Sequence, residues 1–202
     1  MMIYDESHLI KMLDALPREL RTAFAALCAE RLAPAYAAFA GRLGSLDAAK
    51  LTSILGRLWL ALNGEPITGE EIQSDLDLCM TLIQADDEGQ WSSLRAYAED
   101  AVASVAYALR AQQNGESQEA AWAARRAYEA IDHFVINRDK IDTSEVGAEK
   151  RIIDHPLVQQ ELAQQQKDLD DLNALAHQSE WREELTKLRA RAAVHSYDFL
   201  II

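Results

Sequence analysis

Apolar residues recur along the chain at intervals of three and four, which is the spacing of one face of an α-helix. The first such stretch covers residues 5–16, and a second begins at Pro17. Further stretches with this spacing cover residues 47–62, 68–83, 91–113 and 117–137. No alternating strand pattern lasts beyond a few residues. The pattern therefore predicts a chain built from helices.

Proline interrupts the second of these segments. Its apolar face runs through Leu20, Phe24, Leu27 and Cys28 before the chain reaches Pro34. A proline inside a helix removes one backbone hydrogen bond and clashes with the preceding turn. We therefore expect a break or a kink at Pro34, followed by a short third helix through Tyr36, Phe39 and Leu43.

Polar residues mark the ends of two predicted helices. Thr68 and Glu71 have the spacing of a capping box, in which each side chain binds a free backbone amide of the other residue. Asn63-Gly64 suits the C-terminal end of the preceding helix, and Asn114-Gly115 suits the end of the helix over residues 91–113.

The helical spacing lapses between Arg138 and Asp154, where polar residues and Gly147 replace the apolar stripe. We interpret residues 138–154 as a long loop that could contain a helical turn. Loops often carry function, so the role of this segment stays open. The pattern that follows resembles the preceding helices, and we therefore expect one all-α domain over residues 1–202, a bundle of about seven to nine helices.

The C-terminal part begins with a heptad-like seam that is about three repeats long: Val158, Leu162, Gln165, Leu169, Leu172 and Ala176. Packing within the chain is favoured for this seam, with a dimer interface as the alternative. Ser179 can cap a last helix that includes Trp181 and Leu185. The apolar tail, residues 197–202, should dock onto its own bundle or onto a second subunit, because free termini otherwise fray.

The composition agrees with helices and limits the partners. Gly (8) and Pro (4) are too few for the many turns of an all-β chain, and alanine is abundant. The net charge of −13 disfavours nucleic acid and anionic lipid as partners. No run approaches the ~18 apolar residues of a membrane span, and the first residues lack a secretory signal pattern. We therefore expect a cytoplasmic protein in which Cys28 and Cys79 are buried or half-buried thiols.

Motifs of known chemistry are missing from the sequence. It contains no phosphate-binding glycine loop and no GxSxG, and no histidine follows a glutamate by three residues as in di-metal bundles. Glu129, Asp132 and His133 are weak metal candidates on one helix. We expect no cofactor and no metal. A nucleophile formed by Cys28 and a distant histidine is disfavoured. Thiolate chemistry needs a polarising neighbour that the sequence does not identify, so a buried helical cysteine is the favoured interpretation.

Several short patterns together resemble the YjaG-like family of uncharacterised bacterial proteins (domain of unknown function 416). They are Glu30-Arg31-x-x-Pro34-x-Tyr36-x-x-Phe39, Ile54-Leu55 with Trp59, Asp100-Ala101, and Pro156-x-Val158-x-x-Glu161. The resemblance implies an all-helical cytoplasmic bacterial protein and no known activity. Residues 138–154 and the first dozen residues match the family pattern least.

Glu30 and Arg31 are the most prominent polar pair. The structural interpretation pairs Arg31 with an acid such as Glu30 or Asp100, so that two helices are held together. The functional alternative is a pocket at the mouth of the bundle, where Arg31 binds an anion. The candidate ligand-binding residues are Glu30, Arg31, Tyr36, Trp59 and Asp100. We favour the structural interpretation.

The sequence favours a helical protein that is not an enzyme and works by binding. Its candidate partners are a second copy of the chain, giving a homodimer, and an unidentified protein or small molecule. The alternative is an enzyme or a small-anion-binding protein with its pocket near Arg31. A deep pocket with converging polar groups would favour the enzyme, and a flat apolar contact would favour the binding protein.

Overall fold

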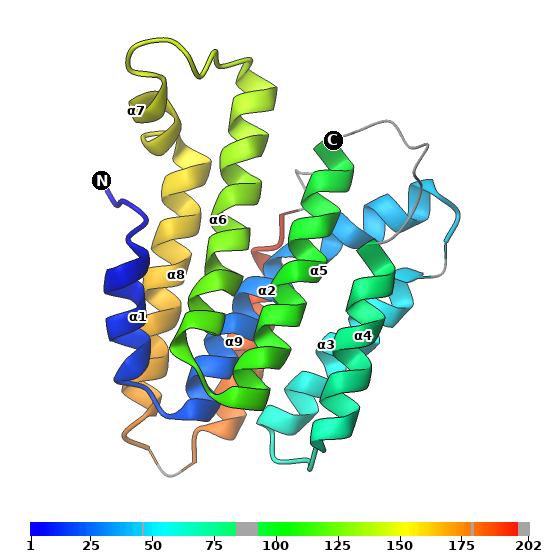
Figure 1. The fold of residues 1–202 in the computed structure, drawn as a ribbon. Helices are drawn as coiled ribbons and strands as arrows, with labels where there is room; N and C mark the ends of the chain where they lie inside the picture. Colours follow the sequence, from blue (N-terminus) through cyan, green and yellow to red (C-terminus); the bar gives the residue numbers. More distant parts are fainter. Residues whose placement is uncertain (46, 84–92, 179, 198–202) are drawn as a thin grey trace.

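The computed structural model describes residues 1–45, 47–83, 93–178 and 180–197. Within these residues all regular elements are α-helices, nine in number (Figure 1). They are α1 (Glu6–Asp14), α2 (Arg18–Arg42), α3 (Asp47–Leu62), α4 (Gly69–Ile83), α5 (Ser93–Asn114), α6 (Ser117–Asp139), α7 (Ala148–Ile153), α8 (Pro156–Leu175) and α9 (Arg182–Val194). The prediction of an all-α bundle is confirmed.

Helix α2 lies at the centre of the bundle and contacts α3, α5, α6, α8 and α9. Figure 1 shows α6, α5 and α4 side by side in front of it. Residues 22–29 of α2 are buried on all sides, and four of these eight residues are alanine. Small side chains let neighbouring helices approach closely from several directions. Buried apolar side chains from all the described helices join in one hydrophobic cluster around α2.

Helix α2 continues through Pro34 to Arg42, so the expected separate third helix is wrong. Pro34 cannot donate to the carbonyl of Glu30, and this loss is the cost of a proline inside a helix. The flanking residues Leu32, Ala35 and Tyr36 are all buried. Their burial against neighbouring helices favours the helix on both sides of Pro34 and outweighs the missing hydrogen bond.

The predicted helix ends at residues 63–71 and 114–115 are confirmed. The backbone N–H of Thr68 donates to Glu71 Oε2 at 2.8 Å, and the N–H of Glu71 donates to Thr68 Oγ1 at 3.1 Å. Gly64 and Gly115 follow α3 and α5 with φ of 103° and 76°, a conformation that glycine adopts without steric cost.

The segment over residues 138–154 contains more helix than we expected. Helix α6 extends to Asp139, residues 140–147 form a loop, and α7 occupies Ala148–Ile153. The six residues of α7 are too few to show a helical period in the sequence. Burial of Ala148 and Ile152 anchors this helix against the bundle.

The C-terminal seam packs within the chain. Helix α8 contacts α6, α2 and α7, and most seam residues from Val158 to Leu172 are buried. Tyr197, the first residue of the predicted tail, is buried, and its N–H donates to the carbonyl of Arg31 at 3.0 Å. The remaining tail residues and Ser179, the predicted cap of the last helix, lie outside the described residues. None of the described helices is both long and apolar enough to cross a membrane.

Candidate functional site

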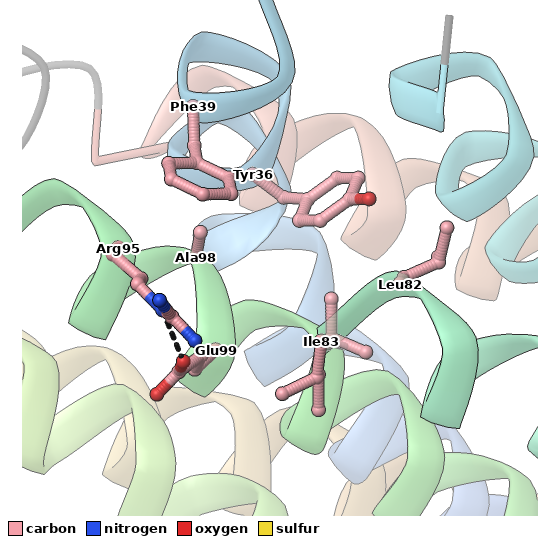
Figure 2. A pocket seen from close by; sticks show the side chains of 8 residues that line it. Tyr36, Phe39, Leu82, Ile83, Arg95, Ala98 and Glu99 are labelled. Carbon is pink, nitrogen blue, oxygen red and sulfur yellow. Dashed lines mark hydrogen bonds and ion pairs between the residues drawn. The ribbon is translucent and has the colours of Figure 1, made fainter. Parts of the chain in front are cut away.

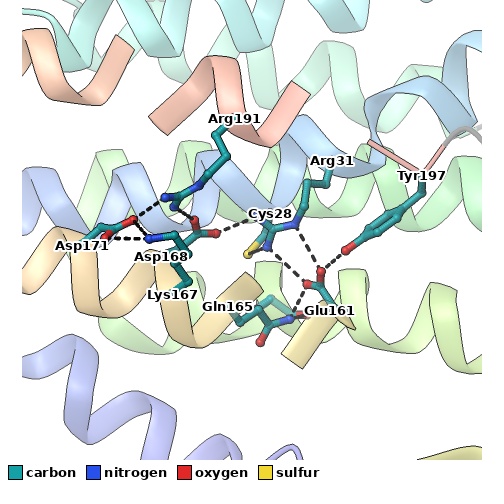
Figure 3. Close-up of polar contacts among 10 residues, drawn as sticks. Cys28, Arg31, Glu161, Gln165, Lys167, Asp168, Asp171, Arg191 and Tyr197 are labelled. Carbon is teal, nitrogen blue, oxygen red and sulfur yellow. Dashed lines mark hydrogen bonds and ion pairs between the residues drawn. The ribbon is translucent and has the colours of Figure 1, made fainter. Parts of the chain in front are cut away.

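Arg31 projects from α2 into a fully buried cluster of charged side chains (Figure 3). Its Nη1 lies 2.6 Å from Oδ2 of Asp168, and its Nε lies 3.2 Å from Oε2 of Glu161. Both carboxylates belong to α8, and all three side chains are at most 1% exposed. Arg31 therefore joins α2 to α8, as the structural interpretation expects, but its partners are not Glu30 or Asp100.

Further residues complete the cluster. Gln165 Nε2 donates to Glu161 Oε1 at 2.6 Å, and the hydroxyl of Tyr197 also donates to Glu161. Arg191 of α9 binds the second oxygen of Asp168 at 2.6 Å. These contacts connect α2, α8, α9 and Tyr197, the third residue after α9. We call the group the Arg31 cluster; its members are Arg31, Glu161, Gln165, Asp168, Arg191 and Tyr197.

The charges and the burial in the Arg31 cluster shift the pKa values of Arg31, Glu161 and Cys28. Burial alone lowers the pKa of Arg31, but the neighbouring charges of Glu161 and Asp168 outweigh it and raise that pKa. Burial raises the pKa of Glu161, and the Arg31 guanidinium opposes that rise. Burial also raises the pKa of the Cys28 thiol strongly, even though Arg31 Nη2 lies 3.5 Å from its sulfur. Cys28 is therefore a protonated, buried thiol and a poor nucleophile.

Sequence reasoning missed the partners of Arg31 because they lie more than a hundred residues away along the chain. A signal was nonetheless present in α8. Glu161, Gln165 and Asp168 follow one another at intervals of four and three, on the side of the helix that carries the apolar seam. Polar residues at core-facing positions indicate a buried partner, and Arg31 supplies it here.

Glu30 and Trp59, two of the predicted site residues, do come together. Trp59 Nε1 donates to Glu30 Oε2 at 2.8 Å, which joins α3 to α2. Arg189 of α9 contacts both residues: its Nε lies 3.4 Å from Glu30 Oε1, and its guanidinium lies 5.5 Å from the centre of the Trp59 ring. Trp59 is only 1% exposed, so this contact also fastens helices to one another.

Tyr36 lines a small recess between α2, α4 and α5 (Figure 2). Phe39, Leu82 and Ile83 make the recess apolar, and Arg95 pairs with Glu99 at 2.9 Å beside it. Burial, followed by the charges of Asp47 and Cys79, raises the pKa of Tyr36 to about 12. The hydroxyl therefore stays protonated at neutral pH.

Asp100 belongs to a different polar group, between α5 and α6. Its Oδ1 lies 3.2 Å from Nη1 of Arg126, which also binds Glu129 at 2.7 Å. Burial raises the pKa of Asp100 to about 6 against the pull of Arg126. Glu129, one of the weak metal candidates, is held by Arg125 as well as Arg126. Asp132 and His133 complete no cluster of metal ligands within the described part of the chain.

A further feature is a half-exposed aromatic pair on α5 and α6, beside α4, which sequence reasoning did not identify. The rings of Tyr107 and Trp122 lie 5.4 Å apart, and the guanidinium of Arg110 lies 5.6 Å from the centre of the Tyr107 ring. A surface hollow adjoins them, lined in part by Asp77, Met80 and Ala106. We call these six residues the α4–α6 face. Three of them lie on neighbouring turns of α5, a spacing that the sequence contains but does not distinguish from a buried stripe.

Comparison with known proteins supplies the family. The model of a family described as a protein of unknown function, DUF416, matches residues 8–196. A crystal structure of a DUF416 family protein from Shewanella baltica OS155 has a similar fold, with a TM-score of 0.77 over 91% of this chain and 92% of that chain. The two sequences are 18% identical, so the likeness concerns the fold. No curated protein matches the sequence. The chain therefore belongs to the DUF416 family, whose function is unknown.

Proposed function

We propose that this protein is not an enzyme and works by binding through its surface, with a second copy of the chain as its first partner. The observation that carries the proposal is the contrast between two groups of residues. The charged groups of the Arg31 cluster bind one another out of contact with solvent. The α4–α6 face instead offers large side chains that are partly exposed.

The residue types of the α4–α6 face match those enriched in protein interfaces. Trp, Tyr, Arg and Met are over-represented there, and Trp, Tyr and Arg dominate binding energies. Met80 is 54% exposed, although it is a large apolar residue. The hollow beside Met80 is lined in part by the apolar residues Leu76 and Ala106. A side chain of the partner can fill this hollow. The face thus combines an aromatic pair with a hollow that has both apolar and polar lining residues.

The charges on the α4–α6 face favour a second copy as the partner. Asp77 and Arg110 both border the hollow, and neither forms an ion pair within the described residues. In a two-fold symmetric contact a residue at one position faces a different position on the other subunit. Asp77 of each copy can then face Arg110 of the other. The face is thus nearly neutral and self-complementary in a chain of net charge −13.

The alternative, an anion site or an enzyme active site near Arg31, finds less support. An anionic ligand would have to displace Glu161 or Asp168 from a guanidinium that is 1% exposed. Breaking a buried ion pair leaves an uncompensated charge and costs several kcal/mol, roughly 3–5. We also propose a cytoplasmic location, which the two buried free thiols, Cys28 and Cys79, support.

Sedimentation equilibrium of two matched variants tests the proposal. Met80→Glu places a charge in the centre of the α4–α6 face, and Leu60→Glu places the same charge on α3, at an apolar side chain of similar exposure (54% and 47%). We expect the wild type and Leu60→Glu to form dimers and Met80→Glu to be monomeric. A monomeric wild type, or equal dimerisation of both variants, would contradict the proposal. Circular dichroism checks that both variants remain helical.

A further inference from the structure

A furrow runs between α1 and α8, on a different part of the molecule from the α4–α6 face. Both helices pack against α6, with fewer contacts between themselves, and Figure 1 shows them adjacent at one edge of the bundle. Leu9, Leu162 and Leu169 form its apolar floor, and His8 stands at its rim. Its volume is about 70 Å³, so it is a shallow recess in which a bound molecule stays partly open to solvent.

The furrow has one buried polar group on its floor, the side-chain amide of Gln165. The hydrogen bonds of this amide fix its orientation. Its nitrogen lies 2.6 Å from a carboxylate oxygen of Glu161 and 3.0 Å from the carbonyl oxygen of Ala124, and both of these atoms are acceptors. Only the NH₂ end of the amide can face two acceptors. The carbonyl oxygen of Gln165 must therefore point away from them, as Figure 3 shows.

That oxygen has no donor among the described residues, although Gln165 is only 5% exposed. It is not enclosed in the protein either, because it is absent from the fully buried atoms that lack a partner. The oxygen therefore faces the furrow, which Gln165 lines. Because this oxygen faces the furrow, a ligand that displaces water from it must bring a donor of its own.

We propose that the furrow between α1 and α8 binds a compact, mainly apolar, uncharged molecule whose single hydroxyl or N–H group donates to Gln165 Oε1. The three leucines contact the apolar body of the ligand. An uncharged donor fits because the Glu161 carboxylate behind Gln165 is already neutralised by Arg31. This site adds a small ligand to the proposed interaction protein, and it does not depend on dimerisation.

Two isomeric probes test the hydrogen bond. 1-Octanol and heptyl methyl ether have the same atoms and similar apolar bodies, but only the alcohol can donate. We expect ¹H–¹⁵N spectra of the wild type to show saturable shifts at Leu9, Leu169 and the Gln165 side-chain amide. The alcohol should bind about fivefold more tightly than the ether, the effect of one net hydrogen bond. Equal affinities, or shifts elsewhere only, would overturn the proposal.

Variants separate the acceptor from the apolar floor. Gln165→Met should abolish the preference for the alcohol while keeping weak binding of both probes. Leu169→Phe should fill the furrow and weaken both probes without touching the Arg31 cluster, and Leu60→Phe on α3 is the matched control. If Gln165→Met does not fold, the probe comparison in the wild type still decides. Undiminished binding to a folded Leu169→Phe protein would place the probes outside the furrow and refute the assignment.

Discussion

At the scale of single residues, the central feature is a group of buried charges that pair with one another. Arg31 lies between two carboxylates of α8, and Arg191 binds the far side of Asp168. Removing such charges from water costs free energy, and this cost offsets much of the energy gained from their mutual attraction. The Arg31 cluster therefore fixes which helices meet, and it adds less to stability than the number of its ion pairs suggests.

Replacing Arg31 by methionine tests this role. The change leaves Glu161 and Asp168 buried without their shared cation, so the free energy of unfolding should fall by about 3–5 kcal/mol. The double variant Arg31→Met/Glu161→Leu should lose less than the sum of the two single losses, because each single change strands a charge that the double change removes. Urea denaturation gives all four values. Strict additivity would show that the charges are not coupled.

Asp100 should make stability depend on pH. Its folded pKa of about 6 lies above the ordinary value of 3.8, so the folded protein holds this proton more tightly than the unfolded chain does. The contribution is fully present below pH 3.8 and is lost as the pH rises through 6. Relative to Asp100→Asn, the wild type should lose up to about 3 kcal/mol between pH 4 and pH 7.5.

Three neighbouring charged groups face Asp100 and set the control for that measurement. They are Arg126, Glu129 and His133 on α6. Because His133 is one of the groups that influence the pKa of Asp100, the pH series should be repeated in a His133→Gln background. A constant difference between the wild type and Asp100→Asn across the pH range, in both backgrounds, would show that burial does not raise the pKa of Asp100.

At the scale of helices, α2 shows how far sequence reasoning reaches. The apolar spacing on both sides of Pro34 predicted helix, and the structure has helix on both sides. The break between them was wrong because burial of Leu32 and Tyr36 depends on helices that are distant in the sequence. Most other helices follow from their period and caps. The six residues of α7, which show no period, do not.

Tyr197 binds the backbone of α2 in the turn before Pro34. A proline weakens the hydrogen bonding of carbonyls in the turn before it. The carbonyl of Arg31, three residues before Pro34, accepts the N–H of Tyr197 at 3.0 Å. The part of the predicted tail that the structure describes thus begins with a backbone bond to α2. Contacts of this kind cannot be predicted from local patterns, because donor and acceptor are more than 160 residues apart.

Helix α9 should be among the less stable parts of the bundle. It buries Leu185, Leu188 and Ala192 only, and ion pairs from Arg189 and Arg191 account for much of its attachment. Segments with few buried apolar contacts open before the core does. Amides of α9 should exchange with deuterium at least tenfold faster than those of α5, and Arg191→Ala should widen the gap. Equal protection of α5 and α9 would contradict this account.

At the scale of the whole molecule, the Arg31 cluster is buried and the residues of the α4–α6 face are partly exposed. The family, fold and structural role of α8 could be anticipated from the sequence. The α4–α6 face could not, because the sequence does not show which side of α5 the other helices leave uncovered. Of the residues predicted to form one site, Glu30 and Trp59 are in contact, whereas Tyr36 and Asp100 each lie in a different part of the bundle.

Net charge should affect self-association. Two copies that each carry −13 repel one another over long distances, and salt screens this repulsion. The Asp77–Arg110 pairs at the edge of the contact are exposed and contribute little, about 0–1 kcal/mol each. We therefore expect the dimer to become severalfold tighter between 20 and 200 mM salt, as measured by sedimentation equilibrium. Weakening over that range would show that the ion pairs dominate.

The most direct test of the proposed interface is native mass spectrometry of two charge-reversed variants, alone and mixed. Arg110→Asp gives two acidic positions on the α4–α6 face, and Asp77→Arg gives two basic ones. Like charges facing one another cost several kcal/mol, more than the weak pairs contribute. Each variant alone should therefore appear mainly at the chain mass of about 22.6 kDa, and the mixture should contain a heterodimer with one chain of each kind. Homodimers of either variant, or a mixture that stays monomeric under conditions where the wild type dimerises, would contradict the account.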